Sequence, residues 1–365
     1  MMMTERDLYA SAKQTGIISA KQDNTLTSAG MELLCKELRQ INENPEKFNN
    51  QITQYLKHFG GALPAHEPIS AIFATKELFF TCIGVDGSQI YPDPFSPIRF
   101  GWVSALAYEM GHGVTLKDGL CVSEQILDLA EDEQTVRNYI DLSRAVIEMK
   151  VASEVADKGG SNKVVLLDGS LIPWASFSRN TSLRIRSLLD QYQTYFSKSQ
   201  GSLIASVISN PHSRSVINLI EFSLVIPVDA YKPVRYGYRD RDLFTHVLKN
   251  GERSAIFFNG SAHNQRFTKK GLGIYFFYLK VNDEIMRIEL PQWIAKEPEK
   301  VDLVHSAIHY DSTDLSYPYS LAQAHYHVVL KNDVADAIRN LAESAYYQAG
   351  GKVRHWSAKN RIKHS

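Results

Sequence analysis

Two short segments of this sequence each place an aspartate after a run of apolar residues and follow it with Gly and Ser. Asp86 follows residues 79–85 in "FFTCIGVDGSQI", and Asp168 follows residues 164–167 in "KVVLLDGSLI". Runs of this length predict buried strands, so each carboxylate is expected where a strand ends. A single Asp-Gly pair is ordinary turn chemistry. Two such pairs side by side at one sheet edge would instead supply hard oxygen ligands for Mg²⁺ or Mn²⁺. The glycines would let a metal or phosphate approach the backbone.

A long helix predicted over residues 133–156 offers a third carboxylate, Glu148. A glutamate on an apolar helix face is either a rim residue, whose stem covers apolar surface, or a ligand. Glu154 is a competing candidate, but it shares its face with two lysines, which predicts a solvated position. The face of Glu148 is small and apolar and is expected to lie close against the sheet; it contains Ala145, Ala152 and Val155.

The segment "SYPYSLAQAHYHVVL" carries further candidates. Tyr317 precedes Pro318, which favours an extended backbone. Ser320 is expected to be the N-cap of a final helix that runs to about residue 347. His325 falls on the apolar stripe of that helix, where a lone histidine is usually a hydrogen-bonded core residue. Beside a carboxylate cluster it would instead contact a phosphate or move a proton near neutral pH.

The composition is that of an ordinary globular protein, with 44% hydrophobic and 22% charged residues. Lys plus Arg and Asp plus Glu number 40 each, so a nucleic acid would have to be bound by local patches. The three cysteines are scattered and indicate neither a disulfide framework nor a cysteine-based metal site. No apolar signal core and no stretch of membrane-spanning length is present. We therefore expect a cytoplasmic protein with no membrane partner.

The order of the predicted elements indicates an α/β fold. Residues 1 to about 60 have a polar, helical pattern, and "ALPAHEPIS" is a linker. From there, several strands, a long helix, and further strands and helices predict one mixed sheet flanked by helices. The expected organisation is a helical N-terminal extension over residues 1–68, a main domain over 69–347 and a basic C-terminal tail over 348–365.

Six segments in order resemble the NurA nucleases over about residues 80–330. They are "IGVDGSQIYPD", "VIEMKVA", "VVLLDGSLI", "YFFYLKVNDEIMRIELPQWIA", "VHSAIHYDS" and "YPYSLAQAH". The resemblance implies an RNase H-like core, a homodimer, a Mn²⁺ or Mg²⁺ cofactor, and a hexameric HerA-type ATPase as partner. It also implies a DNA nuclease, with single-strand endonuclease and 5′–3′ exonuclease activity, that acts in end resection during double-strand break repair.

The same resemblance implies roles for particular residues. Tyr319 is a second candidate for the family's catalytic tyrosine, because the motif holds two. Many relatives carry a lysine just after the strand that corresponds to "SLIASVIS", whereas this chain continues "NPHSRS", and Arg214 is the expected substitute. The family's metal-binding acids correspond to Asp86, Glu148 and Asp168, and its catalytic tyrosine and histidine to Tyr317 and His325.

DNA contacts are expected in the segment "YKPVRYGYRDRDLF", where tyrosines alternate with cations. Aromatic faces stack on unpaired bases while cations follow the backbone; the alternative is a solvated loop. The tail over residues 352–363 has five Lys or Arg and no acid, which makes it a second candidate. The predicted DNA-binding residues are Arg214, Tyr231, Lys232, Arg235, Tyr236 and Arg239.

Two other classes of function compete with a nuclease. Actin-like and sugar-kinase ATPases use related sheets, but here Gly follows Asp immediately in both segments, and no G-x-x-x-x-G-K-[ST] loop occurs. A non-catalytic DNA-binding or scaffold subunit of a translocase complex would have a decayed site, whereas all five candidate residue types are present. Metal-dependent cleavage by the pure protein separates these alternatives.

Overall fold

The computed structural model describes residues 13–14, 28–41, 61–93, 96, 100–122, 133–157, 162–174, 183–224, 237–330 and 332–351. The chain forms two compact units. The first comprises Met1–Thr75, Ser209–Arg266 and Tyr275–Ile288, and the second comprises Lys76–Ile208, Phe267–Ile274 and Glu289–Ser365. The domain boundaries expected at residues 68 and 347 stay a prediction.

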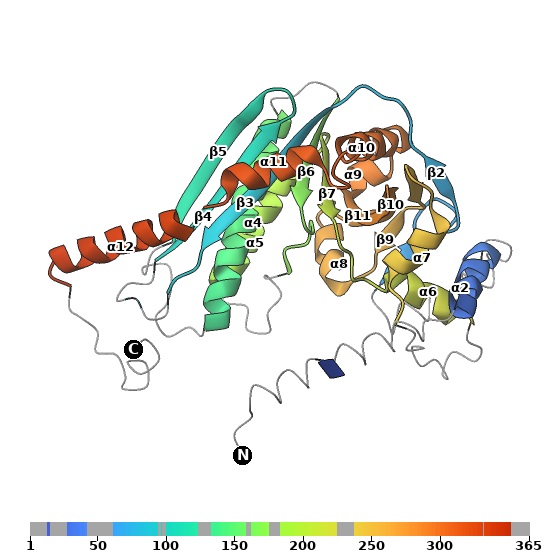
Figure 1. The fold of residues 1–365 in the computed structure, drawn as a ribbon, viewed down its shortest axis with the longest axis horizontal. Helices are drawn as coiled ribbons and strands as arrows, with labels where there is room; N and C mark the ends of the chain where they lie inside the picture. Colours follow the sequence, from blue (N-terminus) through green and yellow to red (C-terminus); the bar gives the residue numbers. More distant parts are fainter. Residues whose placement is uncertain are drawn as a thin grey trace, which may run out of the picture. The chain divides into compact units, whose positions relative to one another are not determined.

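The second unit is built on a mixed sheet in which the strand order is β7-β6-β3-β4-β5 (Figure 1). β3, β4 and β5 are consecutive antiparallel strands, whereas β6 pairs parallel to β3 and β7 parallel to β6. This mixed sheet flanked by helices confirms the predicted fold class. The strands are β3 (Thr81–Ile90), β4 (Gly101–Glu109), β5 (Gly113–Val122), β6 (Lys163–Asp168) and β7 (Leu203–Ile208).

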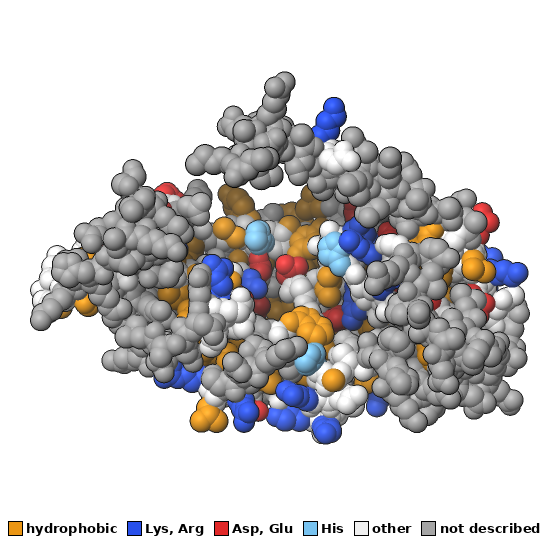
Figure 2. Space-filling view, turned by 90° about the horizontal axis from the view of Figure 1, so that it is seen from below, with side chains coloured by type: hydrophobic (Ala, Val, Ile, Leu, Met, Phe, Trp, Pro, Cys, Tyr) orange, Lys and Arg blue, Asp and Glu red, His pale blue; other side chains and the backbone are white. Residues whose placement is uncertain are grey.

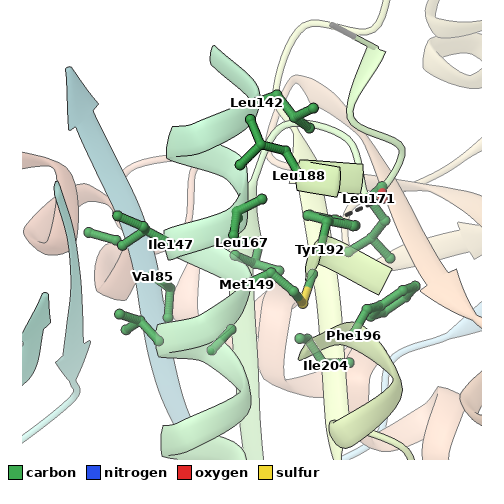
Figure 3. Packing of buried hydrophobic residues seen from close by; sticks show 14 of the residues in the cluster. Val85, Leu142, Ile147, Met149, Leu167, Leu171, Leu188, Tyr192, Phe196 and Ile204 are labelled. Carbon is green, nitrogen blue, oxygen red and sulfur yellow. Dashed lines mark hydrogen bonds between the residues drawn. The ribbon is translucent and has the colours of Figure 1, made fainter. Parts of the chain in front are cut away.

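Helices α4 (Glu133–Asp157) and α5 (Leu183–Lys198) pack against each other and form one side of the main core of this unit. Alternate residues of β3, β4 and β6 supply the other side, because side chains of one strand parity point to one face. Figure 3 shows this packing, in which the aromatic rings of α5 lie beside the apolar side chains of α4 and β6. The remaining helices of the unit are α9 (Gln292–Ala295), α10 (Pro298–Asp311), α11 (Tyr319–Val328) and α12 (Asn332–Gln348).

Two glycines of β3 determine how closely helices approach the sheet. A Cβ atom at Gly84 would lie 2.3 Å from the carbonyl carbon of Ser320 in α11. A Cβ atom at Gly87 would lie 2.3 Å from Oε1 of Glu148 in α4. Because the two positions are three residues apart, they point to opposite faces of the sheet. α11 and α4 therefore cover opposite faces of β3 (Figure 1).

Three expectations about element ends are wrong. β3 does not end at residue 85 but continues to Ile90, because its antiparallel pairing with β4 extends past Asp86. The final helix is two helices, α11 and α12, with a break between Val328 and Asn332. The N-cap of α11 is Pro318, since the Ser320 hydroxyl bonds a side chain of another helix instead.

The first unit has its own apolar core. The four residues that share a helical stripe in α2 (Ser28–Gln40) and just after it are buried there, whereas the second predicted N-terminal helix lies outside the described residues. The other elements are β1 (Ala62–Pro64), β2 (Ile72–Ala74), α6 (Ser215–Leu224), α7 (Asp240–Val247), β8 (Glu252–Ser254) and β9 (Phe257–Asn259). Three more, α8 (Ala262–Thr268), β10 (Ile274–Val281) and β11 (Glu284–Pro291), extend by a few residues into the second unit.

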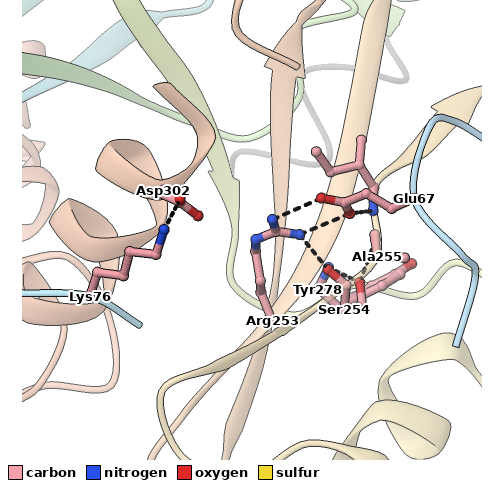
Figure 4. Close-up of polar contacts among 8 residues, drawn as sticks. Glu67, Lys76, Arg253, Ser254, Ala255, Tyr278 and Asp302 are labelled. Carbon is pink, nitrogen blue, oxygen red and sulfur yellow. Dashed lines mark hydrogen bonds and ion pairs between the residues drawn. The ribbon is translucent and has the colours of Figure 1, made fainter. Parts of the chain in front are cut away.

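A buried ion pair ties the linker of the first unit to its strands. The guanidinium of Arg253, only 2% exposed, donates to both carboxylate oxygens of Glu67 at 2.9 and 3.0 Å (Figure 4). Glu67 also accepts the backbone N–H of Ile256 at 2.7 Å. Such bidentate pairs fix geometry as well as contributing energy. Within the second unit, Lys76 likewise pairs with Asp302 of α10 (Figure 4).

The contact at Gly84 predicts a large cost for a single methyl group. Gly84→Ala places its Cβ against backbone atoms of α11, which cannot rotate away, so we expect a loss of about 1–3 kcal/mol or more in the free energy of unfolding. Thermal unfolding measures this loss. Gly87→Ala is the matched control, because there the added atom meets side-chain atoms of Glu148 and Arg144 and not backbone, so the loss should be smaller. Equal losses at the two positions would contradict this account.

Candidate active site

The register of β3 and β6 brings the two Asp-Gly-Ser segments together. The parallel pairing places Val85 opposite Leu167, so the next residues, Asp86 and Asp168, occupy neighbouring positions on strands about 4.8 Å apart. β6 ends at Asp168 while β3 continues. The Asp86 carboxylate is buried, at 5% exposure, whereas Asp168 stays accessible to solvent. Two carboxylates therefore lie side by side at this point of the sheet.

The glycines after the two aspartates have different structural roles. Gly87 leaves the space that the Glu148 carboxylate fills, and so admits a third acid from α4. Gly169 has a φ of +83°, a left-handed conformation that glycine adopts without strain, and nothing lies within 4 Å of its Cβ position. The expected approach of a ligand to both glycines is therefore wrong for Gly87, where a protein side chain occupies the space.

His325 contacts the first aspartate. Its Nδ1 lies 2.7 Å from Oδ2 of Asp86; since a carboxylate only accepts, Nδ1–H donates. The other carboxylate oxygen of Asp86 accepts the backbone N–H of Gly87 at 2.7 Å. The histidine side chain is 67% exposed, while Leu321 and Val328 of the same helix are buried. The interpretation of His325 as a core histidine is therefore wrong.

Tyr317 contacts the second aspartate. Its hydroxyl donates to Oδ1 of Asp168 at 3.1 Å. Burial, followed by the negative charge of Asp168, raises the pKa of Tyr317 well above its usual range, so the phenol keeps its proton and acts as a donor. The alternative tyrosine, Tyr319, is 40% exposed and packs edge-on against Tyr108 of β4 instead.

A buried carboxylate positions the segment that carries these two residues. Asp311, the last residue of α10, accepts the Ser320 hydroxyl at 2.7 Å and the Ser320 backbone N–H at 3.3 and 3.4 Å. Both side chains are almost fully buried. This contact ties the end of α10 to the start of α11, so Tyr317 lies in a short loop that is fixed at both ends.

Arg144 is a residue of this site that the sequence reasoning missed. It lies one helical turn before Glu148, and its Nε is 3.5 Å from the Glu148 carboxylate. The charge of Glu148, and to a smaller extent that of Asp86, acts to raise the pKa of Arg144, whereas burial acts to lower it. The Arg-x-x-x-Glu spacing in the sequence could have identified Arg144 as a partner of Glu148, because residues four apart on a helix are neighbours.

Burial and neighbouring acids raise the pKa values of Glu148 and Asp168. Burial raises the pKa of Glu148 to about 7; Arg144 opposes this shift, and the charges of Asp86 and Asp168 add to it. The pKa of Asp168 is raised by desolvation and then by the charge of Asp86, while the Tyr317 hydroxyl opposes the rise. The pKa values of Glu148 and Asp168 are thus raised in part by neighbouring negative charge, and a site with this excess of negative charge favours a cation.

The donor chemistry of this site fits a divalent cation, although its present arrangement does not enclose one. Within the described ranges, no group of three or more His, Cys, Asp or Glu side chains is arranged to hold a metal ion. Each acid instead faces a protein donor: Asp86 faces His325, Asp168 faces Tyr317 and Glu148 faces Arg144. The carboxylate oxygens are the hard ligands that Mg²⁺ and Mn²⁺ prefer.

The predicted DNA-binding residues fall into two groups. Arg214 forms an ion pair with the buried Glu221 at 3.2 Å, and Arg239 is the N-cap residue of α7, with its backbone N–H bonded to Asp242. These two contacts lie within the first unit. Figure 2 shows one face of the molecule, with acidic side chains visible near its centre. The other four, Tyr231, Lys232, Arg235 and Tyr236, lie outside the described residues, as does the basic tail from residue 352 onward.

The fold and the comparisons with known proteins identify the family. The chain has the RNase H-like α/β fold, and the NurA domain model matches residues 80–330. This chain belongs to the NurA family. It is similar to the NurA nuclease from Sulfolobus solfataricus, with 16% identity and a TM-score of 0.55, covering 87% of this chain and 99% of that one.

A second structure, of NurA with manganese, has 12% identity and a TM-score of 0.45, covering 89% of this chain and 97% of that one. A comparison with curated proteins gave no match. A search of the described helices found none long and apolar enough to cross a membrane.

Because Gly87 leaves room for the Glu148 carboxylate, Gly87→Ala is expected to weaken metal binding. The new Cβ would displace the Glu148 carboxylate, so we expect Mn²⁺ affinity, measured by calorimetry, to fall by about 10-fold or more. The matched control is Gly87→Ala in a Glu148→Ala background, where it should cause no further loss. An additional loss of affinity in that background would show that Gly87 acts in some other way.

The pKa of Glu148 predicts a pH-dependent stability. Its folded value of about 7 lies above the ordinary 4.5, so the folded chain binds this proton more tightly than the unfolded chain. Protonation of Glu148 therefore stabilises the folded chain fully below about pH 4.5, and this contribution is lost as pH rises through 7. The free energy of unfolding falls by about 3 kcal/mol between these two limits.

Thermal unfolding in chelator should show wild type losing stability relative to Glu148→Gln across this range. Added Mn²⁺ should restore the wild type at the high-pH end, because the carboxylate form is the ligand. If stability changed with pH in the same way in wild type and Glu148→Gln, the raised pKa of Glu148 would not be the cause of the pH dependence.

Proposed function

We propose that this protein is a DNA nuclease that depends on a divalent metal, Mn²⁺ or Mg²⁺, held by Asp86, Glu148 and Asp168. The observation that carries the proposal is the in-register pair of aspartates, to which α4 adds Glu148. Membership of the NurA family supports the same assignment. A bound divalent cation supplies Lewis-acid stabilisation of the charge that develops on a scissile phosphate and lowers the pKa of a bound water.

The neighbouring side chains then act through their own hydrogen bonds. Asp86 orients the His325 ring by accepting from Nδ1, which leaves the exposed Nε2 side of the ring to take up or give a proton at the phosphate. Tyr317 donates to Asp168 and so orients that carboxylate. Arg144 balances the charge of Glu148 and provides a cation beside the acids.

The finer activities form part of the proposal and rest on the family alone. They are single-strand endonuclease and 5′–3′ exonuclease activity at DNA ends in double-strand break repair, a homodimer, a hexameric HerA-type ATPase as partner, and a cytoplasmic location. The helical extension over residues 1–68 and the basic tail over 348–365 would flank the nuclease domain. The predicted DNA contacts from Tyr231 to Arg239 belong to the same proposal.

The deciding experiment is cleavage by the pure protein. We expect wild type to degrade single-stranded DNA with Mn²⁺ or Mg²⁺ and to be inactive in chelator. We expect Asp168→Asn to remove cleavage while thermal stability stays near wild type, because this side chain is accessible rather than part of the core. Activity in chelator, or near-native activity in Asp168→Asn, would reject the metal mechanism. DNA binding without any metal-dependent cleavage would favour the scaffold alternative.

The roles of His325 and Tyr317 give a graded prediction. His325→Ala should reduce the cleavage rate by about 10²–10⁴-fold, the usual contribution of acid–base catalysis. Tyr317→Phe should reduce activity or metal affinity by about 10–100-fold, as expected for a partner of a ligating carboxylate. Tyr319→Phe is the matched control and should stay near wild type, because its ring packs on Tyr108. A larger effect at Tyr319 than at Tyr317 would reverse the assignment.

A further inference from the structure

A cluster of aromatic rings covers the outer side of α11 and the adjacent strand β4. We call the rings of Tyr108, Tyr319, Tyr326 and His327 the α11 ring cluster. Tyr326 is 76% exposed and Tyr319 is 40% exposed. His327 is also exposed. A tyrosine with three quarters of its surface in water contributes little to the core, so the burial of apolar surface does not account for its presence.

The helical spacing explains why these rings point outward. Tyr319 and Tyr326 are seven residues apart and therefore lie on the same side of the helix. The opposite side packs against the sheet, where Leu321, Ala324 and Val328 are almost fully buried. His327 lies between the two sides and reaches toward β4.

The four rings form a continuous arrangement. His327 stacks on Tyr108 with ring centroids 5.7 Å apart and planes inclined by 11°. Tyr326 meets His327 edge-on at 5.2 Å, and Tyr319 meets Tyr108 edge-on at 6.3 Å. The contacts with His327 and Tyr108 hold the more exposed rings in place, so a ligand that stacks on them has less side-chain entropy to remove.

The α11 ring cluster is continuous with the candidate active site. Tyr326 directly follows His325, whose ring contacts Asp86 on the other flank of the same helix. Anything bound on Tyr326 therefore lies one residue along the helix from the side chain that faces the carboxylates. This adjacency indicates which ligand the α11 ring cluster binds. A DNA strand with one phosphate at the carboxylates has its neighbouring nucleotides beside α11.

We propose that the α11 ring cluster is a stacking platform for unpaired bases of the DNA strand engaged at the carboxylate site. The inference rests on the proposed function and names the state of its substrate: the bases must be unpaired, since a duplex hides their faces. Stacking of a base on an aromatic side chain is tolerant of sequence, because every base has a π face. The platform therefore selects single strands without selecting a sequence.

The test measures binding in chelator, so that cleavage does not interfere. Wild type, Tyr326→Ala and Tyr326→Phe are titrated with a fluorescent oligothymidylate and with an abasic strand of the same length. Tyr347→Ala in α12 is the matched control, since Tyr347 is also a partly exposed tyrosine, at 42%. Thermal unfolding and solution mass are recorded for each variant.

We expect Tyr326→Ala to bind oligothymidylate about 5- to 100-fold more weakly, which is the usual cost of losing one base–aromatic stacking contact. Tyr326→Phe and Tyr347→Ala should bind like wild type, and the abasic strand should bind equally to all four proteins. Because no divalent ion is present, this pattern can hold even when the nuclease test fails, which keeps the two proposals distinguishable.

Three results would overturn the inference. Unchanged binding of oligothymidylate by Tyr326→Ala would exclude stacking at this ring. Equal weakening on the oligothymidylate and the abasic strand would assign Tyr326 to phosphate contact or to the fold. A change in solution mass with unchanged DNA binding would assign the α11 ring cluster to an interface between copies of the chain.

Discussion

The parallel pairing of β3 with β6 is the constraint on which the site depends. A shift of one residue would turn one aspartate to the opposite face of the sheet and separate the pair. The observed register, with Val85 opposite Leu167, keeps both acids on neighbouring positions. Two apolar residues before each aspartate are buried in the same core, so the hydrophobic pattern that folds the sheet also sets the spacing of the acids. They are Ile83 and Val85 before Asp86, and Val165 and Leu167 before Asp168.

The repeated Asp-Gly-Ser sequence does not correspond to a repeated structure. In the first copy the strand continues, and the glycine makes room for an acid from α4. In the second copy the strand ends, and the glycine provides a left-handed turn. The Ser170 hydroxyl of that turn donates to the buried Glu289 at 2.9 Å, which also accepts the backbone N–H of Leu171. The same tripeptide therefore has two different structural roles beside one site.

The sequence predicted what depends on local pattern. Apolar runs located the strands, helical spacing located α4 and the face of Glu148, and the order of elements gave the mixed sheet. The sequence could not show that β3 continues past Asp86, because a partner strand and not local propensity decides where a strand ends. It also placed His325 on an apolar stripe without showing that its ring lies on the flank, next to Asp86. Arg144 was missed because its significance lies in a contact with another candidate.

The contact between α11 and Gly84 joins two backbones without an intervening side chain. Most helices pack on a sheet through side chains, which can change rotamer when a strand moves slightly. No side chain separates the two backbones here, and the Asp311–Ser320 contact fixes the same end of the helix. A displacement of β3 at Gly84 would therefore displace the start of α11 as well. His325 and the exposed tyrosines of α11 are carried by the same helix, so helical geometry fixes the spacing of their backbone positions.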